Sequence, residues 1–228
     1  MATRGTDPVP DPLARAAWLL LALIVALATA ACADTPAVAM KATERDAVRT
    51  VGVNPAVKVP GEIYYLDHAQ GLGMGIGGAV GGLIASSGGA DGQIVDALAS
   101  NAISVGAIVR TEFVAASATV GDIAFVDSTA AHVAELTLVV NLYGLSYASP
   151  LDAALYPMLS VTATIRRADG NVVWQKTAAA TVLTADNKLG YSFSQYIQDP
   201  ERLRAVFANA AAIVSRVLVA DLRGGPGA

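Results

Sequence analysis

Residues 159–176 read LSVTATIRRADGNVVWQK, and this stretch decides the fold. Two segments with β-branched residues flank Asp169-Gly170, a dipeptide that favours the tight turn of a β-hairpin because glycine adopts positive φ without steric cost. The pattern predicts antiparallel strands over 159–167 and 172–182, joined by a two-residue turn.

A third strand is predicted before the hairpin, over residues 135–143. Its side chains alternate in character, which is the period of a β-strand. Leu136, Leu138, Val140 and Leu142 are expected on one face, and Thr137, Val139, Asn141 and Tyr143 on the other.

Shorter strands are predicted over 47–59, where Asn54-Pro55 interrupts the pattern, over 62–66, and from Phe125. Residues 93–118 are predicted to form one helix, because apolar residues recur near one of its faces. These residues are Ile94, Leu98, Val105, Val109, Phe113 and Ala116.

A last helix is predicted to begin after Asp199, a suitable N-cap, with Pro200 and Glu201 in its first turn. Gly224-Gly225-Pro226 is expected to end it. Its buried stripe is expected to contain Leu203, Val206, Phe207, Ala210, Val214, Val217 and Leu218.

The order of these elements predicts one α+β domain over residues 47–222, with a mostly antiparallel sheet and helices on one face. Residues 223–228 are expected to be a disordered tail. The layout and the hairpin around Asp169-Gly170 and Trp174 resemble periplasmic lipoproteins of the transport-auxiliary and curli-secretion type. This resemblance is one of architecture and does not carry function.

Residues 1–31 are predicted to be a signal peptide. Residues 16–31 read AAWLLLALIVALATAA without a charge, after Arg4 and Arg15. A short apolar run that follows positive charge and ends in small residues is typical of secretory signals. A membrane-spanning helix needs about 20 apolar residues, so a spanning anchor here would be short.

The chain's single cysteine, Cys32, follows this run directly in the sequence Thr29-Ala30-Ala31-Cys32. The arrangement resembles the bacterial lipoprotein signal, whose cysteine is lipidated with fatty acids such as palmitate and becomes the mature N-terminus. Thr29 departs from the aliphatic residue that the family prefers. The alternative is an ordinary signal peptide cleaved nearby, with Cys32 incidental.

The resemblance implies a protein held in the outer membrane and facing the periplasm, because Ala33 rather than Asp follows the cysteine. Residues 33–46 are small and polar without periodicity, so residues 32–46 are expected to be a flexible, lipid-anchored tether. Fourteen flexible residues reach roughly 20 Å, at about 5–6 Å times the square root of their number.

The segment 69–90 is uncharged and rich in glycine. Glycines four residues apart let two apolar helices approach closely, so membrane insertion or self-association into a homo-oligomer is one interpretation. The other is a mobile surface loop, since glycine disfavours helix in water. The glycines concerned are Gly71, Gly73, Gly75, Gly77, Gly78, Gly81 and Gly82.

Composition limits the function. Hydrophobic residues make up 54% of the 228 residues, charged residues 15%, and the net charge is −4 without a basic block, which disfavours disorder and nucleic-acid binding. One cysteine excludes a disulfide framework and a cysteine-based zinc site. His68 and His132 have no partner at a catalytic spacing. We expect no metal and no cofactor, and the match of residues 73–78 to G-x-G-x-x-G follows from their glycine content.

No motif of hydrolases, metalloproteases or nucleotide-binding enzymes is present in the sequence. We therefore expect a non-enzymatic accessory or assembly factor of a cell-envelope complex, attached to the membrane through Cys32, with an unidentified protein partner. The alternatives are an auxiliary subunit of a lipid or solute transporter, and a secretion-channel-like oligomer that uses residues 69–90.

Overall fold

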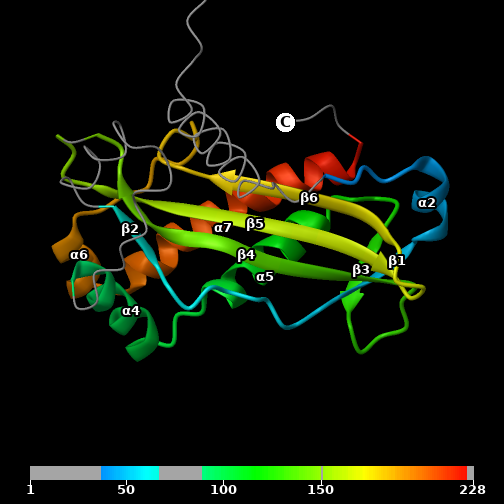
Figure 1. Cartoon of the computed structure of the whole chain (residues 1–228), viewed down its shortest axis with the longest axis horizontal. Coiled ribbons are helices and arrows are strands. Elements are labelled where there is room, and N and C mark those ends of the chain that lie inside the picture. The colour runs from blue at the N-terminus through cyan, green and yellow to red at the C-terminus, as the bar shows by residue number, and fades with distance from the viewer. Residues whose placement is uncertain (1–36, 67–88, 150, 225–228) are drawn as a thin grey trace, which may run out of the picture. The chain divides into compact units, whose positions relative to one another are not determined.

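The computed structural model describes residues 37–66, 89–149 and 151–224, which belong to one compact unit (Figure 1). Its helices and strands in chain order are α2 Ala42–Ala47, β1 Thr50–Val53, β2 Tyr64–Leu66, α4 Ala90–Ser100, α5 Val105–Ser117, β3 Ala124–Asp127, β4 Ala134–Tyr147, β5 Leu155–Arg167, β6 Val172–Ala180, α6 Phe193–Gln198 and α7 Glu201–Leu222.

The strands form one six-stranded sheet in the order β3-β1-β4-β5-β6, with β2 paired to β4. The β4–β5 and β5–β6 pairs are antiparallel, whereas β1 and β2 are both parallel to β4. The α+β class is confirmed, and the sheet is mixed. The chain from β1 to β2 follows one edge of β4, because Val51 pairs with Ala134 and Tyr64 pairs with Gly144.

The helices α5 and α7 pack against each other, and α7 also packs on β5 and β6. Figure 1 shows both helices behind the sheet. The predicted last helix is confirmed, since the residues of its apolar stripe are buried or, for Val217, half-buried. Its N-cap is Pro200 and not the predicted Asp199. By length and composition α7 could cross a membrane, but 56% of its apolar window is buried inside the protein, as in the core helix of a globular domain.

The predicted alternation along β4 holds only as far as Val140. A β-bulge at Asn141 shifts the register, so that Val140 pairs with Val161 but Leu142 pairs with Ser160. An extra residue in one strand reverses which side chains face the core. Tyr143 is therefore buried, with its ring 6.0 Å from that of Phe207 on α7, and its predicted outward orientation is wrong.

The predicted hairpin between β5 and β6 is confirmed, but its turn contains three residues, 168–170. The amide of Arg167 donates to the carbonyl of Asn171 at 2.9 Å and closes this loop. Gly170 has φ of +88°, the conformation for which glycine is favoured. The carboxylate of Asp169 accepts a hydrogen bond from the amide of Asn171 at 3.0 Å, which stabilises the turn.

The single helix predicted over 93–118 is wrong, because the segment contains two helices, α4 and α5, bent by 67°. Ser104 begins the second helix, since its hydroxyl accepts a hydrogen bond from the amide of Ala107 at 3.2 Å. The predicted apolar residues still face the interior, because the break lies between two sets of buried positions.

The flexible tether predicted over 32–46 is wrong for residues 37–46. Val38 forms an isolated bridge with Gln175 on β6, and residues from Ala42 form α2. The side chain of Arg45 donates to the carboxylate of Asp122 at 2.8 Å and to the carbonyl of Leu222. Small polar residues can dock on a domain through backbone and ionic contacts, which hydrophobic periodicity does not reveal.

Candidate functional site

The strand β6 is an edge of the sheet, and the first described residues lie on its free side. The amide of Val38 donates to the carbonyl of Gln175 at 2.8 Å, and the amide of Gln175 donates to the carbonyl of Val38 at 2.9 Å. This bridge is antiparallel, so Ala37 lies nearer than Met40 to the C-terminal end of β6. We define the β6 edge as residues 37–39 together with β6 and residues 181–192 that follow it.

Beyond β6, the loop 181–192 is attached firmly to β5. The buried side chain of Asn187 donates to the carbonyls of Pro157 at 2.8 Å and Thr181 at 3.0 Å. Tyr191 forms a backbone bridge with Leu155. The loop therefore has a fixed base.

The buried hydroxyl of Tyr196 on α6 supports the same region. It donates to the carbonyl of Leu155 at 2.8 Å and accepts from the amide of Tyr191 at 3.2 Å. Burial raises the pKa of Tyr196 above its ordinary value, because the phenolate would lose its hydration. Tyr196 thus remains a neutral hydrogen-bond donor over the physiological pH range.

Two leucines at this end of the sheet point into solvent. Leu183 in the loop 181–192 is 88% exposed, and Leu151 in the β4–β5 connection is 96% exposed. The described part of the chain has three other exposed large hydrophobic residues, at 37–51%. The two leucines are therefore the outstanding apolar groups on the described surface, and their loops emerge from the same end of adjacent strands.

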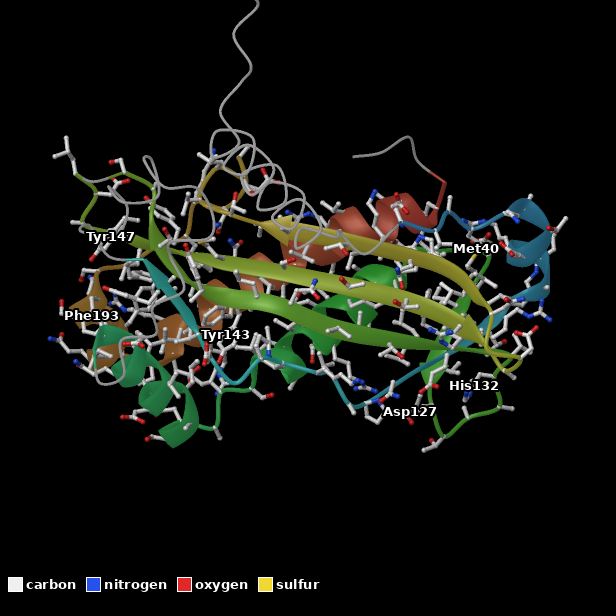
Figure 2. All side chains as sticks on the ribbon, viewed as in Figure 1. Met40, Asp127, His132, Tyr143, Tyr147 and Phe193 are labelled. Carbon is white, nitrogen blue, oxygen red and sulfur yellow. The ribbon has the colours of Figure 1, made fainter. Side chains whose placement is uncertain are left out.

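Charged residues are unevenly spaced along the sequence of the strands. In the sequence no charged residue lies between Lys176 and Asp186, and Asp152 is the only one between Glu135 and Arg166. Because β4 and β6 run antiparallel to β5, both uncharged stretches meet at the end that carries the leucines. Charged residues outside the strands lie at this end too, since the guanidinium of Arg202, which pairs with Asp199, lies 4.7 Å from the ring centre of Tyr191 in the loop 181–192. In Figure 2 this end carries Tyr147 and Phe193, whereas His132 and Asp127 lie at the other.

The opposite end of these strands contains a hollow of about 410 Å³. Glu135 accepts from the side-chain amide of Asn54 at 2.6 Å, and Arg166 donates to the carbonyl of Gly170 at 2.6 Å. A ring nitrogen of the exposed His132 lies 2.7 Å from the carbonyl of Ala130. Each of these three side chains thus contacts another group of the protein. Among the described residues, His132 forms no catalytic arrangement with a carboxylate.

A second hollow, of about 500 Å³, lies between the end of α5 and β3. Its two charged residues, Arg49 and Asp122, pair with Asp46 and Arg45 respectively. The guanidinium of Arg45 lowers the pKa of the Asp122 carboxyl by donating a hydrogen bond to it. Within the described residues, no group of three His, Cys, Asp or Glu side chains could hold a metal ion.

The residues that the sequence singled out as functional lie outside the described ranges. They are the signal peptide 1–31, Cys32 and the glycines of 69–88, so their roles stay predictions. Sequence reasoning missed Leu151 and Leu183. The uncharged stretch 177–185 could have pointed to Leu183. The exposure of its side chain, however, depends on how the loop 181–192 folds back on β5.

No protein-family model matches the chain, and no curated protein matches it. Among solved structures, a similar chain is that of a protein from Xanthomonas campestris assigned to the family DUF330. The two are 19% identical, and the match covers 51% of this chain and 61% of that one, with a TM-score of 0.34. This is a weak structural likeness to a bacterial protein.

Proposed function

We propose that the chain is a non-enzymatic lipoprotein of the bacterial outer membrane, lipidated at Cys32 and facing the periplasm. It serves as an accessory or assembly factor for a cell-envelope complex. The support for the address is the sequence around Cys32, where the only thiol of the chain follows an apolar run that ends in small residues.

The observation that carries the proposal is this sequence around Cys32, and the position of Val38 on β6 bears on how near the membrane the domain would lie. Ala37 is five residues after Cys32, and five extended residues span at most about 18 Å. A lipid on Cys32 would therefore hold Ala37 within about this distance of the bilayer. The described chain thus joins the sheet at Val38, six residues after Cys32, so only a short segment separates the proposed anchor from the domain.

A short link to the membrane suits an accessory factor. A domain held near the membrane loses less translational freedom when a membrane-bound partner binds. Durable attachment requires more than one acyl chain, and the lipoprotein type that the sequence resembles carries three.

Metabolic labelling with a clickable fatty acid tests the anchor. The wild-type protein should incorporate the label, and Cys32→Ala should not. Ala33→Ser changes the neighbouring residue and keeps the thiol, so it should label like the wild type. Equal labelling of the wild type and Cys32→Ala, or no labelling of either, would contradict the proposal.

Crosslinking in whole cells tests the accessory role. The wild-type protein should capture a defined component of an envelope complex, and Cys32→Ala should capture less of it at equal abundance, because the variant is no longer held at the membrane. Capture that is unchanged by Cys32→Ala, or a recovered protein that forms no specific crosslink, would contradict the role.

A further inference from the structure

We infer that the hollow beside His132 binds a small zwitterion, a molecule that carries a primary ammonium and an oxyanion a few bonds apart. Glu135 receives the ammonium, and Arg166 receives the oxyanion, which is a carboxylate or a phosphate. The inference gives the domain a ligand and does not depend on lipidation of Cys32.

The register of the sheet places the groups of this site side by side on one face. Glu135 on β4 pairs with Gly52 on β1 and with Arg166 on β5. Side chains of directly opposite residues in antiparallel strands share a face, with Cβ atoms about 4.5–5.5 Å apart. The ring of His132 fills the place that Gly52 leaves open, since a Cβ atom added at Gly52 would lie 2.7 Å from its Nδ1. A row of imidazole, carboxylate and guanidinium thus crosses β1, β4 and β5.

The carboxylate and the guanidinium in this row are neighbours that bond to other groups. Glu135 accepts a hydrogen bond from the side-chain amide of Asn54 at 2.6 Å, and that amide is oriented by its oxygen, which accepts from the amide of Ala56 at 2.8 Å. Arg166 donates to the carbonyl of Gly170 at 2.6 Å. Both residues belong to the described part of the chain, and no ion pair joins them there. Two opposite charges are therefore held near each other without neutralising each other.

The hollow of about 410 Å³ lies beside these two charges, and its lining includes Glu135, His132, Arg166 and Arg167. Clefts that hold small ligands measure roughly 300–1,000 Å³. Arg167 contributes little net charge, because its guanidinium lies 3.5 Å from the carboxylate of Asp169. Among the described residues that line the hollow, the charges without an ionic partner are thus one carboxylate and one guanidinium.

His132 adds a hydrogen-bond acceptor to the site. Its Nδ1 lies 2.7 Å from the carbonyl oxygen of Ala130, which only accepts, so Nδ1 carries the proton in this contact. In the neutral imidazole the other ring nitrogen, Nε2, then has a free electron pair. An ammonium has several N–H donors, so Glu135 and His132 can both accept from it.

A zwitterion matches these charges better than a simple anion does. An anion at Arg166 would lie near the carboxylate of Glu135 and be repelled by it, and an ammonium ion at Glu135 would be repelled by Arg166. A molecule with both charges is attracted by both side chains. Arg166 has enough N–H donors to keep its bond to Gly170 and to contact two oxygens of the ligand.

Titration of the full-length protein in detergent micelles tests the site through its amide NMR resonances. The probes are glycine and O-phosphoethanolamine, which are zwitterions with a carboxylate and a phosphate respectively. Inorganic phosphate and ethanolamine each carry only one of the two charges. A zwitterion should shift the amides of Glu135, Arg166 and Gly170 and bind more tightly than either single-charge compound. The tighter of the two zwitterions identifies the oxyanion.

Glu135→Gln removes the charge and keeps an acceptor for Asn54. It should weaken binding of the zwitterion by about tenfold, because a hydrogen bond to a charged group is lost, without weakening inorganic phosphate. Arg166→Gln should weaken both. The matched controls are Glu201→Gln and Arg204→Gln, which break an exposed ion pair on α7 and should leave binding unchanged.

The inference is overturned if neither zwitterion shifts these amides in the wild type. It is also overturned if inorganic phosphate binds as tightly as O-phosphoethanolamine and Glu135→Gln changes neither, because the hollow is then an anion site. Shifts that persist unchanged in both Glu135→Gln and Arg166→Gln would place the ligand elsewhere. Absence of fatty-acid labelling contradicts only the anchor at Cys32 and leaves these titrations as they are.

Discussion

The indole Nε1 of Trp174 donates a hydrogen bond to the carboxylate of Asp221 at 3.0 Å, and this bond joins the first half of β6 to the last turn of α7. The ammonium of Lys176 lies 2.9 Å from the other oxygen of the same carboxylate. Trp174 is completely buried. One acidic group thus fixes the C-terminal end of the long helix against the strand that also receives Val38.

We expect Trp174→Phe to lower the free energy of unfolding by more than about 1.5–3 kcal/mol, because it removes a hydrogen bond to a charged group and also leaves a cavity in the core. Lys176→Met is the matched control, because it removes only a partly exposed ion pair to the same carboxylate and should cost less than about 1 kcal/mol. Urea unfolding followed by circular dichroism measures both. A larger loss for Lys176→Met would show that the ion pair dominates.

Gly144 is where β2 approaches β4 most closely. A Cβ atom added there would lie 1.8 Å from the carbonyl oxygen of Tyr64, a backbone atom that no rotamer change can move away. We expect Gly144→Ala to destabilise the protein by about 1–3 kcal/mol, the range for overpacking, and to loosen β2. Faster amide exchange at Tyr64 and Tyr65 would report the loosening.

The control for this substitution is Gly121→Ala, because a Cβ at Gly121 meets nothing within 4 Å. It should leave stability unchanged or raise it by about 0.4–1 kcal/mol, through the lower entropy of the unfolded chain. Equal destabilisation by the two substitutions would mean that the close approach of Gly144 to Tyr64 does not limit packing.

Stability should fall in acid through the bond between Arg45 and Asp122. The guanidinium holds the pKa of the Asp122 carboxyl below its ordinary value of 3.8. A carboxyl with a lowered pKa contributes stability above its unfolded-state pKa and loses it as the pH falls through the folded-state value. Asp122→Asn should therefore flatten the decline in the urea midpoint below about pH 4. If the urea midpoints of the wild type and of Asp122→Asn fall in parallel with pH, Asp122 is not the source of the decline.

Stability should also fall in alkali through Tyr196, whose pKa burial raises above 10.0. The folded state then keeps a proton that the unfolded state releases, so the free energy of unfolding decreases as the pH rises above 10. Tyr196→Phe should cost about 0.5–1.5 kcal/mol at neutral pH and make the alkaline decline shallower. Some decline should remain, because burial also raises the pKa of Tyr64 and Tyr143. An alkaline decline as steep in the variant as in the wild type would exclude Tyr196 as its source.

The local sequence pattern was sufficient to predict those elements whose conformation depends on residues close to one another in the sequence. The apolar stripe from Leu203 to Leu218, the alternation from Leu136 to Val140 and the turn at Gly170 are all readable in one segment each. Backbone periodicity and glycine's access to positive φ determine them before any long-range contact forms. The α+β class follows from their order along the chain.

Features that depend on two distant segments could not be read in this way. The bulge at Asn141 is defined only by the strand that pairs with it, so the inward orientation of Tyr143 was inaccessible. The break before Ser104 combines a capping hydroxyl with packing on both sides. The strands β1 and β2 could pair with the edge of any of several strands. No local sequence pattern shows that they pair in parallel with β4.

The candidate site shows the same division. The sequence by itself determined the residues with chemical meaning: the lone Cys32, the uncharged stretch 177–185 and the charges that flank it. Only the tertiary structure decided that Val38 pairs with Gln175 and that Leu183 stands out on a loop tied to β5. Composition is local information, whereas edge pairing and exposure result from which distant strands meet.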